Sequence, residues 1–116
     1  YIIKLGMANS NLYKGSLQTI ILKLLNETDR MYGYEITQKV KLITNNELNI
    51  TEGALYPALH KLEAEGLLEV EVEKVDNRIR KYYRLTEPGQ KETINRLQEL
   101  EDFIKNMQVI VKSQLA

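Results

Sequence analysis

The chain contains no cysteine and no tryptophan, and it has one histidine, one phenylalanine and two prolines among its 116 residues. The lack of cysteine excludes disulfide bonds, thiolate zinc sites, iron–sulfur clusters and a cysteine nucleophile. One imidazole and scattered carboxylates give no assembled nucleophile or acid–base pair. We therefore expect a protein that is not an enzyme and that needs neither a cofactor nor a bound metal.

Long apolar runs are also missing. The longest contain three residues, as in Val109-Ile110-Val111, whereas a membrane-spanning helix needs about 20 and the centre of a signal peptide about 7–15. We therefore expect a cytoplasmic protein that does not contact a membrane. The 16 basic and 16 acidic residues cancel, so any surface that attracts nucleic acid must be local.

The apolar spacing predicts three helices in the first half of the chain. Behind Gly15-Ser16, apolar residues recur at helical spacing through Leu25, which predicts a helix from Ser16. A second helix is predicted over 33–44. Thr51 is placed as an N-cap and Gly66 as a left-handed C-terminal cap, so a third helix should span about 52–65.

From Leu68 the spacing of the apolar residues changes from helical to alternating. Leu68, Val70 and Val72 alternate with glutamates, which predicts a strand with one wet face. Asp76-Asn77 can reverse the chain, and a return strand should run over about 79–85. Thr86 and Pro88 then predict the start of a long helix that continues to about Val111.

Three helices followed by a hairpin form the winged helix-turn-helix arrangement, in which the third helix enters a DNA major groove and the hairpin touches the backbone. We expect a mainly α chain with a small β-hairpin. Its predicted parts are an N-terminal extension (1–13), a winged helix-turn-helix DNA-binding domain (14–86) and a C-terminal dimerisation helix (87–116).

The predicted third helix offers an unusual surface. Leu55, Leu59 and Leu62 cluster on one side and should face the core. The opposite side carries mostly small or flat residues that permit close approach to a groove, namely Gly53, Tyr56, Pro57, His60 and Ala64, with Lys61 at its border. The alternatives are that 52–56 form only a loose first turn and that His60 is an ordinary surface histidine.

Basic residues gather near the hairpin tip. Lys74, Arg78, Arg80 and Lys81 are suited to contact DNA phosphates, and Lys14 lies just before the first helix. The alternative for such a cluster is a solvated loop.

The last helix carries a heptad seam, because its apolar residues are spaced 3, 4, 3, 4. The seam comprises Leu97, Leu100, Ile104, Met107 and Val111, and Phe103 widens it. Leaving these side chains in water would forgo roughly 1.5–3 kcal/mol each. We therefore predict a homodimer, the alternative being that the helix folds back over its own domain.

Several motifs together resemble the PadR family of bacterial transcriptional regulators. They are Lys14-Gly15-Ser16-Leu17, Tyr32-Gly33-Tyr34-Glu35-Ile36, the stretch from Thr51 to Leu59 (Thr-Glu-Gly-Ala-Leu-Tyr-Pro-Ala-Leu), Leu62-Glu63-Ala64-Glu65-Gly66-Leu67 and Arg80-Lys81-Tyr82-Tyr83-Arg84-Leu85-Thr86. The resemblance covers roughly residues 14–89, and the single helix after the hairpin is similar to that of the short family members.

The resemblance implies a homodimeric repressor that binds double-stranded operator DNA. It places DNA contacts at Lys14, Thr51, Gly53, Tyr56, Pro57, Arg80 and Lys81; His60, Lys61 and Arg78 come from the residue pattern alone. It also implies relief of repression by a small aromatic or amphipathic effector. Since Phe103 is the only aromatic residue after Tyr83, we expect an effector pocket between the paired helices to be absent or aliphatic.

A second interpretation stays open. A winged-helix dimer can serve as a protein-interaction adaptor without binding DNA, and the zero net charge is compatible with that role.

Overall fold

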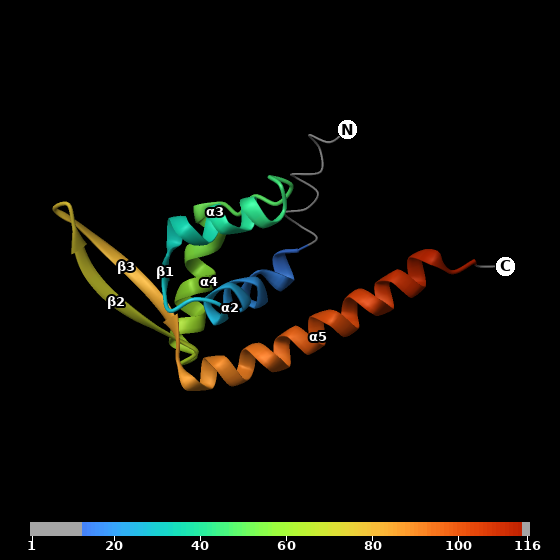
Figure 1. Ribbon diagram of the computed structural model, residues 1–116. Helices are drawn as coiled ribbons and strands as arrows, with labels where there is room; N and C mark the ends of the chain where they lie inside the picture. The colour runs from blue at the N-terminus through green and yellow to red at the C-terminus, as the bar shows by residue number, and fades with distance from the viewer. Residues whose placement is uncertain (1–12, 115–116) are drawn as a thin grey trace.

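Residues 13–114 are described by the computed structural model (Figure 1). It shows a helical head (residues 13–67), a β wing (residues 68–85) and a long helix (residues 87–112) that projects away from the head. The elements follow in the order η1 (Lys14–Ser16), α2 (Leu17–Asn26), β1 (Met31–Tyr32), α3 (Gly33–Ile43), α4 (Glu52–Ala64), β2 (Leu68–Val75), β3 (Arg78–Leu85) and α5 (Glu87–Lys112). The predicted helices and hairpin are therefore confirmed, with small shifts at their ends.

The predicted N-terminal extension lies outside the described residues except for its last member. Tyr13 packs against the hydrophobic core, and its hydroxyl donates a hydrogen bond of 2.8 Å to the carbonyl oxygen of Asn49. This contact joins the start of the head to the loop that leads into α4.

The core lies between α2, α3, α4 and the base of the wing. Its completely enclosed side chains come from all of these elements: Ile21, Leu22, Leu25, Ile36, Leu55, Leu59, Leu62 and Tyr83. The three α4 leucines face inward as their spacing predicts, which fixes the opposite side of that helix as the outer one.

The wing belongs to a sheet of three strands, not to the two-stranded hairpin that the sequence predicts. The strand order is β1-β3-β2, with Met31 and Tyr32 of β1 opposite Tyr83 and Tyr82 of β3. Two residues are too few to show an alternating pattern, so this strand leaves no signal in the sequence.

The wing tip is a two-residue turn. Val75 and Arg78 are register partners, and the residues between them, Asp76 and Asn77, have φ values of 49° and 64°. Positive φ at both central residues is the type I′ geometry, whose twist matches that of the flanking strands. Asp76-Asn77 makes the reversal without glycine because short polar side chains tolerate this conformation.

The start of α5 is tethered to the turn that follows α4. The Thr86 amide donates to the Leu67 carbonyl (3.1 Å), and the Thr86 hydroxyl donates to the Gly66 carbonyl (2.6 Å) and accepts from the Gly89 amide (3.0 Å). Beyond this joint α5 runs along α2 and then projects away from the head (Figure 1). None of the helices in residues 13–114 combines the length and the apolar character needed to span a bilayer.

Candidate nucleic-acid interface

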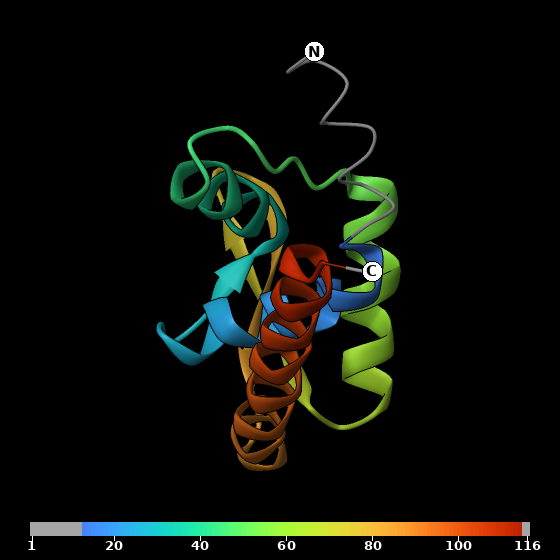
Figure 2. The same ribbon diagram turned by 90° about the vertical axis from the view of Figure 1, so that its right-hand side faces the viewer.

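Helix α4 lies at the edge of the head, and one of its sides faces away from the other helices (Figure 2). It begins where predicted, because the Thr51 side chain accepts a hydrogen bond of 3.2 Å from the Ala54 amide and satisfies one of the free donors of the first turn. The residues predicted to contact DNA are exposed at Thr51, Gly53, Pro57, His60 and Lys61.

Pro57 removes one regular backbone hydrogen bond from α4. A proline has no N–H to donate to the carbonyl four residues earlier, which belongs to Gly53. Both residues are exposed. The helix nevertheless continues from Glu52 to Ala64, which disagrees with the alternative of a loose first turn.

Tyr56 does not stand fully outward as the helical pattern indicates. Its side chain is half-buried and packs against the core, where its ring covers Gly33 at the start of α3. A β-carbon at position 33 would overlap the Tyr56 hydroxyl and lie 2.8 Å from Cζ. Glycine at position 33 therefore sets the place of the Tyr56 ring, and the ring of His60 lies 6.3 Å from it, centroid to centroid.

Four of the predicted site residues come together around one hollow between the wing and the head. This hollow has a volume of about 370 Å³ and is lined by Tyr32, Gly33, Tyr34, Tyr56, Arg78, Ile79, Arg80 and Lys81. Lys14, Thr51, Gly53, Pro57, His60 and Lys61 are not part of its lining. One side chain of α4 and three cationic side chains of the wing therefore line the same hollow.

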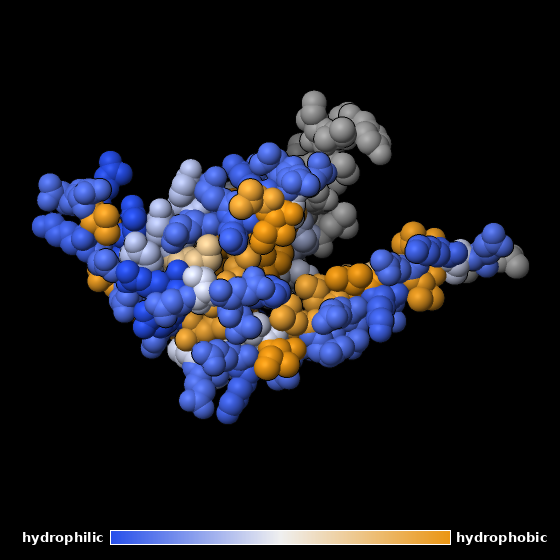
Figure 3. Space-filling model, viewed as in Figure 1, coloured by the Kyte–Doolittle hydropathy of each residue, from blue (hydrophilic) through white to orange (hydrophobic). Residues whose placement is uncertain are grey.

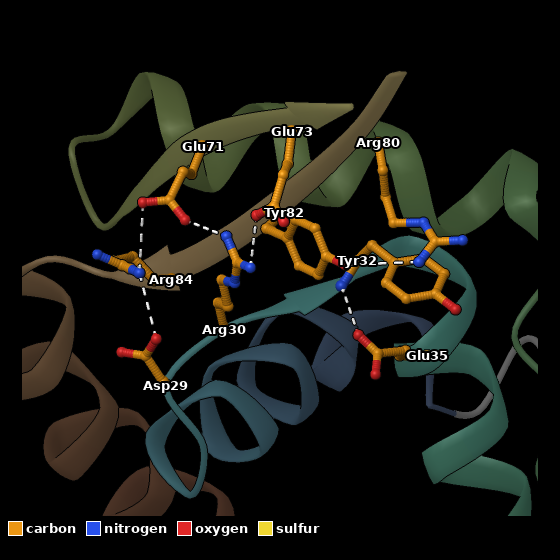
Figure 4. Close-up of polar contacts among 9 residues, drawn as sticks. All are labelled: Asp29, Arg30, Tyr32, Glu35, Glu71, Glu73, Arg80, Tyr82 and Arg84. Carbon is orange, nitrogen blue, oxygen red and sulfur yellow. Dashed lines mark hydrogen bonds and ion pairs between the residues drawn. The ribbon is translucent and has the colours of Figure 1, made fainter. Parts of the chain in front are cut away.

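Stacked aromatic and cationic side chains hold the base of the wing (Figure 4). Tyr32 and Tyr82 meet edge to face, with their centroids 5.5 Å apart. The guanidinium of Arg80 lies 4.1 Å from the Tyr32 centroid, and that of Arg30 lies 3.8 Å from the Tyr82 centroid. The hydrogen bond that Arg80 donates to the Tyr82 hydroxyl raises the pKa of Arg80 above its ordinary value.

Two of the three carboxylates of β2, those of Glu71 and Glu73, are paired with arginines. Arg30 forms ion pairs with Glu71 and, at 2.6 Å, with Glu73. Arg84 reaches Asp29 at 3.2 Å and Glu71 at 3.5 Å. Hydrogen bonding to Glu73 raises the pKa of Arg30, so this guanidinium stays charged. These acids would otherwise stand uncompensated on an element that we expect to approach phosphates.

Tyr32, Tyr34 and Arg30 are among the residues of this region that were not predicted as site residues. Tyr32 and Tyr34 belong to a motif that carries the family resemblance, so the sequence contained a signal for them. Arg30 belongs to no such motif, and nothing in the sequence indicates that it reaches strand β2.

Comparison with known proteins identifies the chain. The model of the PadR-like transcriptional regulator family matches residues 21–95. The chain belongs to this family. It is 43% identical over 84 residues to the uncharacterized protein X of Lysinibacillus sphaericus, covering 72% of this chain and 76% of the relative. It is also 39% identical over 61 residues to the transcriptional regulator Rv3488 of Mycobacterium tuberculosis, covering 53% of this chain and 54% of that protein.

A solved structure supports the family assignment. A transcriptional regulator from Clostridium thermocellum is 33% identical, with a TM-score of 0.81 over 88% of this chain and 99% of that one. The winged-helix architecture with a long last helix is therefore that of a PadR-like regulator, a family and fold of transcriptional regulators and not of enzymes.

Helix α5 of this PadR-like regulator exposes an apolar surface. Leu97 and Leu100 are half-buried, whereas Phe103, Ile104, Met107 and Val111 are 55%, 47%, 38% and 80% exposed. The first half of the seam thus packs on the chain's own head, and the second half does not. Figure 3 shows apolar surface along the side of α5 that is turned toward the head.

An apolar groove lies beside the first half of the seam. Its volume is about 410 Å³, and side chains from three helices and the loop after α3 line it, among them Ile20, Leu24, Val40, Ile43, Leu48, Leu97 and Leu100. Ile43 is 60% exposed at this site. The groove and the outer half of α5 are both apolar surfaces that one chain leaves open to water.

Proposed function

We propose that this PadR-like regulator is a homodimeric, sequence-specific DNA-binding protein that represses transcription. The observation that carries the proposal is the convergence of Tyr56 of α4 with Arg78, Arg80 and Lys81 of the wing around one hollow. A helix that reads bases and cations that hold phosphates are the two components of winged-helix recognition.

The exposed side of α4 enters the major groove in this proposal. Gly53 and Pro57 allow close approach, whereas Tyr56, His60 and Lys61 reach base edges and the adjoining backbone. Lys14, Arg78, Arg80 and Lys81 contact phosphates, and Thr51 contacts the backbone beside the groove while it caps α4. Phosphate contacts fix the register, and the groove contacts supply the discrimination between sequences.

A second copy of the chain covers the apolar surface of α5. The seam residues, with Phe103, pack against their equivalents and against the groove between α2, α3 and α5. Burial of each large side chain stabilises the dimer by roughly 1.5–3 kcal/mol. Two reading heads related by a two-fold axis then recognise a palindromic operator, which one small head could not hold tightly.

Repression follows from occupation of promoter DNA by this dimer. An effector that binds the aliphatic groove would relieve repression by favouring a dimer with another spacing between its heads. Linkage then requires that DNA weaken effector binding by the same factor.

DNase footprinting on the promoter of the protein's own gene tests the proposal. We expect a protected palindrome and a binding constant that falls as salt rises, with a slope set by the number of phosphates contacted. The absence of protection down to low salt would contradict DNA binding and favour the adaptor interpretation.

A further inference from the structure

Glu73 and Arg80 are register partners in the wing, yet they do not form an ion pair. The β2–β3 ladder places Glu73 directly opposite Arg80, so both side chains project from the same face of the sheet. Opposite charges at directly opposed positions attract each other. Within residues 13–114, however, no carboxylate lies within ion-pair distance of Arg80, whose guanidinium is stacked over Tyr32.

Arg30 occupies the carboxylate that Arg80 would otherwise meet. Its Nη2 lies 2.6 Å from Glu73, while its Nη1 pairs with Glu71. Stacking on Tyr82, at 3.8 Å from the ring centroid, fixes the plane of the guanidinium. A planar fork with several donors is suited to hold two carboxylates at once. Figure 4 shows Arg30 on the glutamate side of Tyr82 and Arg80 on the Tyr32 side.

We propose that Arg30 is a positioning residue for DNA binding: by holding Glu73, it leaves the Arg80 guanidinium available to a DNA phosphate. This inference rests on the proposed function. Arg30 does not itself touch DNA. Its effect is exerted through the choice of partner that Glu73 makes, and so through the number of phosphates that the wing neutralises.

Glu71 and Glu73 differ in what they retain when Arg30 is lost. Glu71 keeps Arg84, 3.5 Å away, and stands opposite Tyr82. Within residues 13–114, Glu73 has no ion-pair partner other than Arg30. It stands opposite Arg80 in the ladder. Both glutamate side chains are 45% exposed, and they project from the same face of one strand. Replacing either glutamate with glutamine removes the same charge from the same face of β2. Comparing the two replacements therefore separates the effect of the charge from the effect of its position.

The test measures operator affinity against salt for the full chain and four variants. Arg30→Gln should weaken binding about tenfold, because a charged hydrogen bond to phosphate is lost, and should reduce the salt slope by about 0.9, the value for one phosphate contact. Adding Glu73→Gln to Arg30→Gln should restore both quantities. Adding Glu71→Gln, which makes the same change in charge, should restore neither.

Each contrary result has a defined meaning. Equal rescue by both glutamines would show a general charge effect, and rescue by neither would show that Arg30 does not act through Glu73; either overturns the inference. Wild-type binding by Arg30→Gln would overturn it too, with the proposed function intact. Failure of the wild-type chain to bind DNA would overturn the proposed function instead.

Glu73→Gln alone provides a measurement with Arg30 in place, in case Arg30→Gln does not fold. Since Glu73 is already held by Arg30, its replacement should leave the salt slope unchanged. A rise of about one unit in the slope would show that Glu73 already withholds Arg80 from DNA and would overturn the inference.

Discussion

Gly89 of α5 lies directly against the carbonyl group of Leu67, so that a β-carbon at position 89 would overlap the carbonyl oxygen and stand 3.0 Å from the carbonyl carbon. Backbone cannot move aside as a flexible side chain can, so Gly89→Ala should force α5 off the turn after α4. We expect the free energy of unfolding to fall by about 3 kcal/mol, as measured by urea denaturation.

Gly53 supplies the matched control, since it also lies in the first turn of a helix. A β-carbon there would meet only the Thr51 hydroxyl oxygen at 3.9 Å. Gly53→Ala should therefore stabilise the chain by up to about 1 kcal/mol through helix propensity. A similar loss from both substitutions would show that the contact with Leu67 is not what requires glycine at position 89.

Gly33→Ala should displace the Tyr56 ring without unfolding the head. The added β-carbon would overlap the outer end of that ring, which can rotate away at some cost. We expect a loss of operator affinity comparable with that of Tyr56→Ala, in a protein with an unchanged circular dichroism spectrum. In a Tyr56→Ala background the same substitution should have little further effect, and a full additional loss would contradict the contact as its cause.

Replacing Arg80 and Lys81 together with alanine should weaken binding to all DNA sequences. Because phosphate contacts carry no sequence information, the salt slope should fall by about 1.8, or 0.9 for each contact. Tyr56→Ala should instead reduce the ratio of operator to non-operator affinity, with less change in slope. Titrations of operator and scrambled duplexes at several salt concentrations distinguish the two, and an adaptor would show neither effect.

The dimer can be tested in the heptad seam of α5. Aspartate at both Leu100 and Ile104 would place charges in the seam, and sedimentation should then show monomers. Val109 is 68% exposed and lies outside the heptad seam, so Val109→Asp should leave the dimer intact. An unchanged dimer in the double variant would mean that the interface lies elsewhere.

Burial of Tyr83 predicts a loss of stability in alkali. Desolvation raises the pKa of its phenol above the ordinary value, so the folded chain favours the neutral form. Above about pH 10 the unfolded chain ionises this group and the folded chain resists doing so. The free energy of unfolding should therefore fall more steeply above that pH in the wild-type chain than in Tyr83→Phe. Identical slopes would contradict the shift.

Elements long enough to repeat their apolar pattern several times could be predicted from the sequence. The helices of the head, the alternation of β2 and the heptad seam of α5 all repeat often enough to indicate their structure. Strand β1 could not be predicted, because Met31 and Tyr32 become a strand only through pairing with β3.

The sequence predicts candidate site residues where a motif or a helical face is sufficient. The wing cations and the outer residues of α4 came from such patterns. The half-buried position of Tyr56 depends on Gly33, 23 positions earlier in the chain, and the partners of Arg30 depend on the register of the wing. Such relationships are set by tertiary packing, which no local pattern encodes.

The tether between Thr86 and the Gly66–Leu67 turn fixes the start of α5 on its own head. With 26 residues, α5 is about 39 Å long at 1.5 Å per residue. In the proposed dimer, sliding the two seams by one heptad would displace the heads by about 10 Å, close to a third of the roughly 34 Å between half-sites one DNA turn apart. The register of the two paired α5 helices would therefore set the operator length that the dimer recognises. Substitutions in α5 that change this register should change which operators are bound.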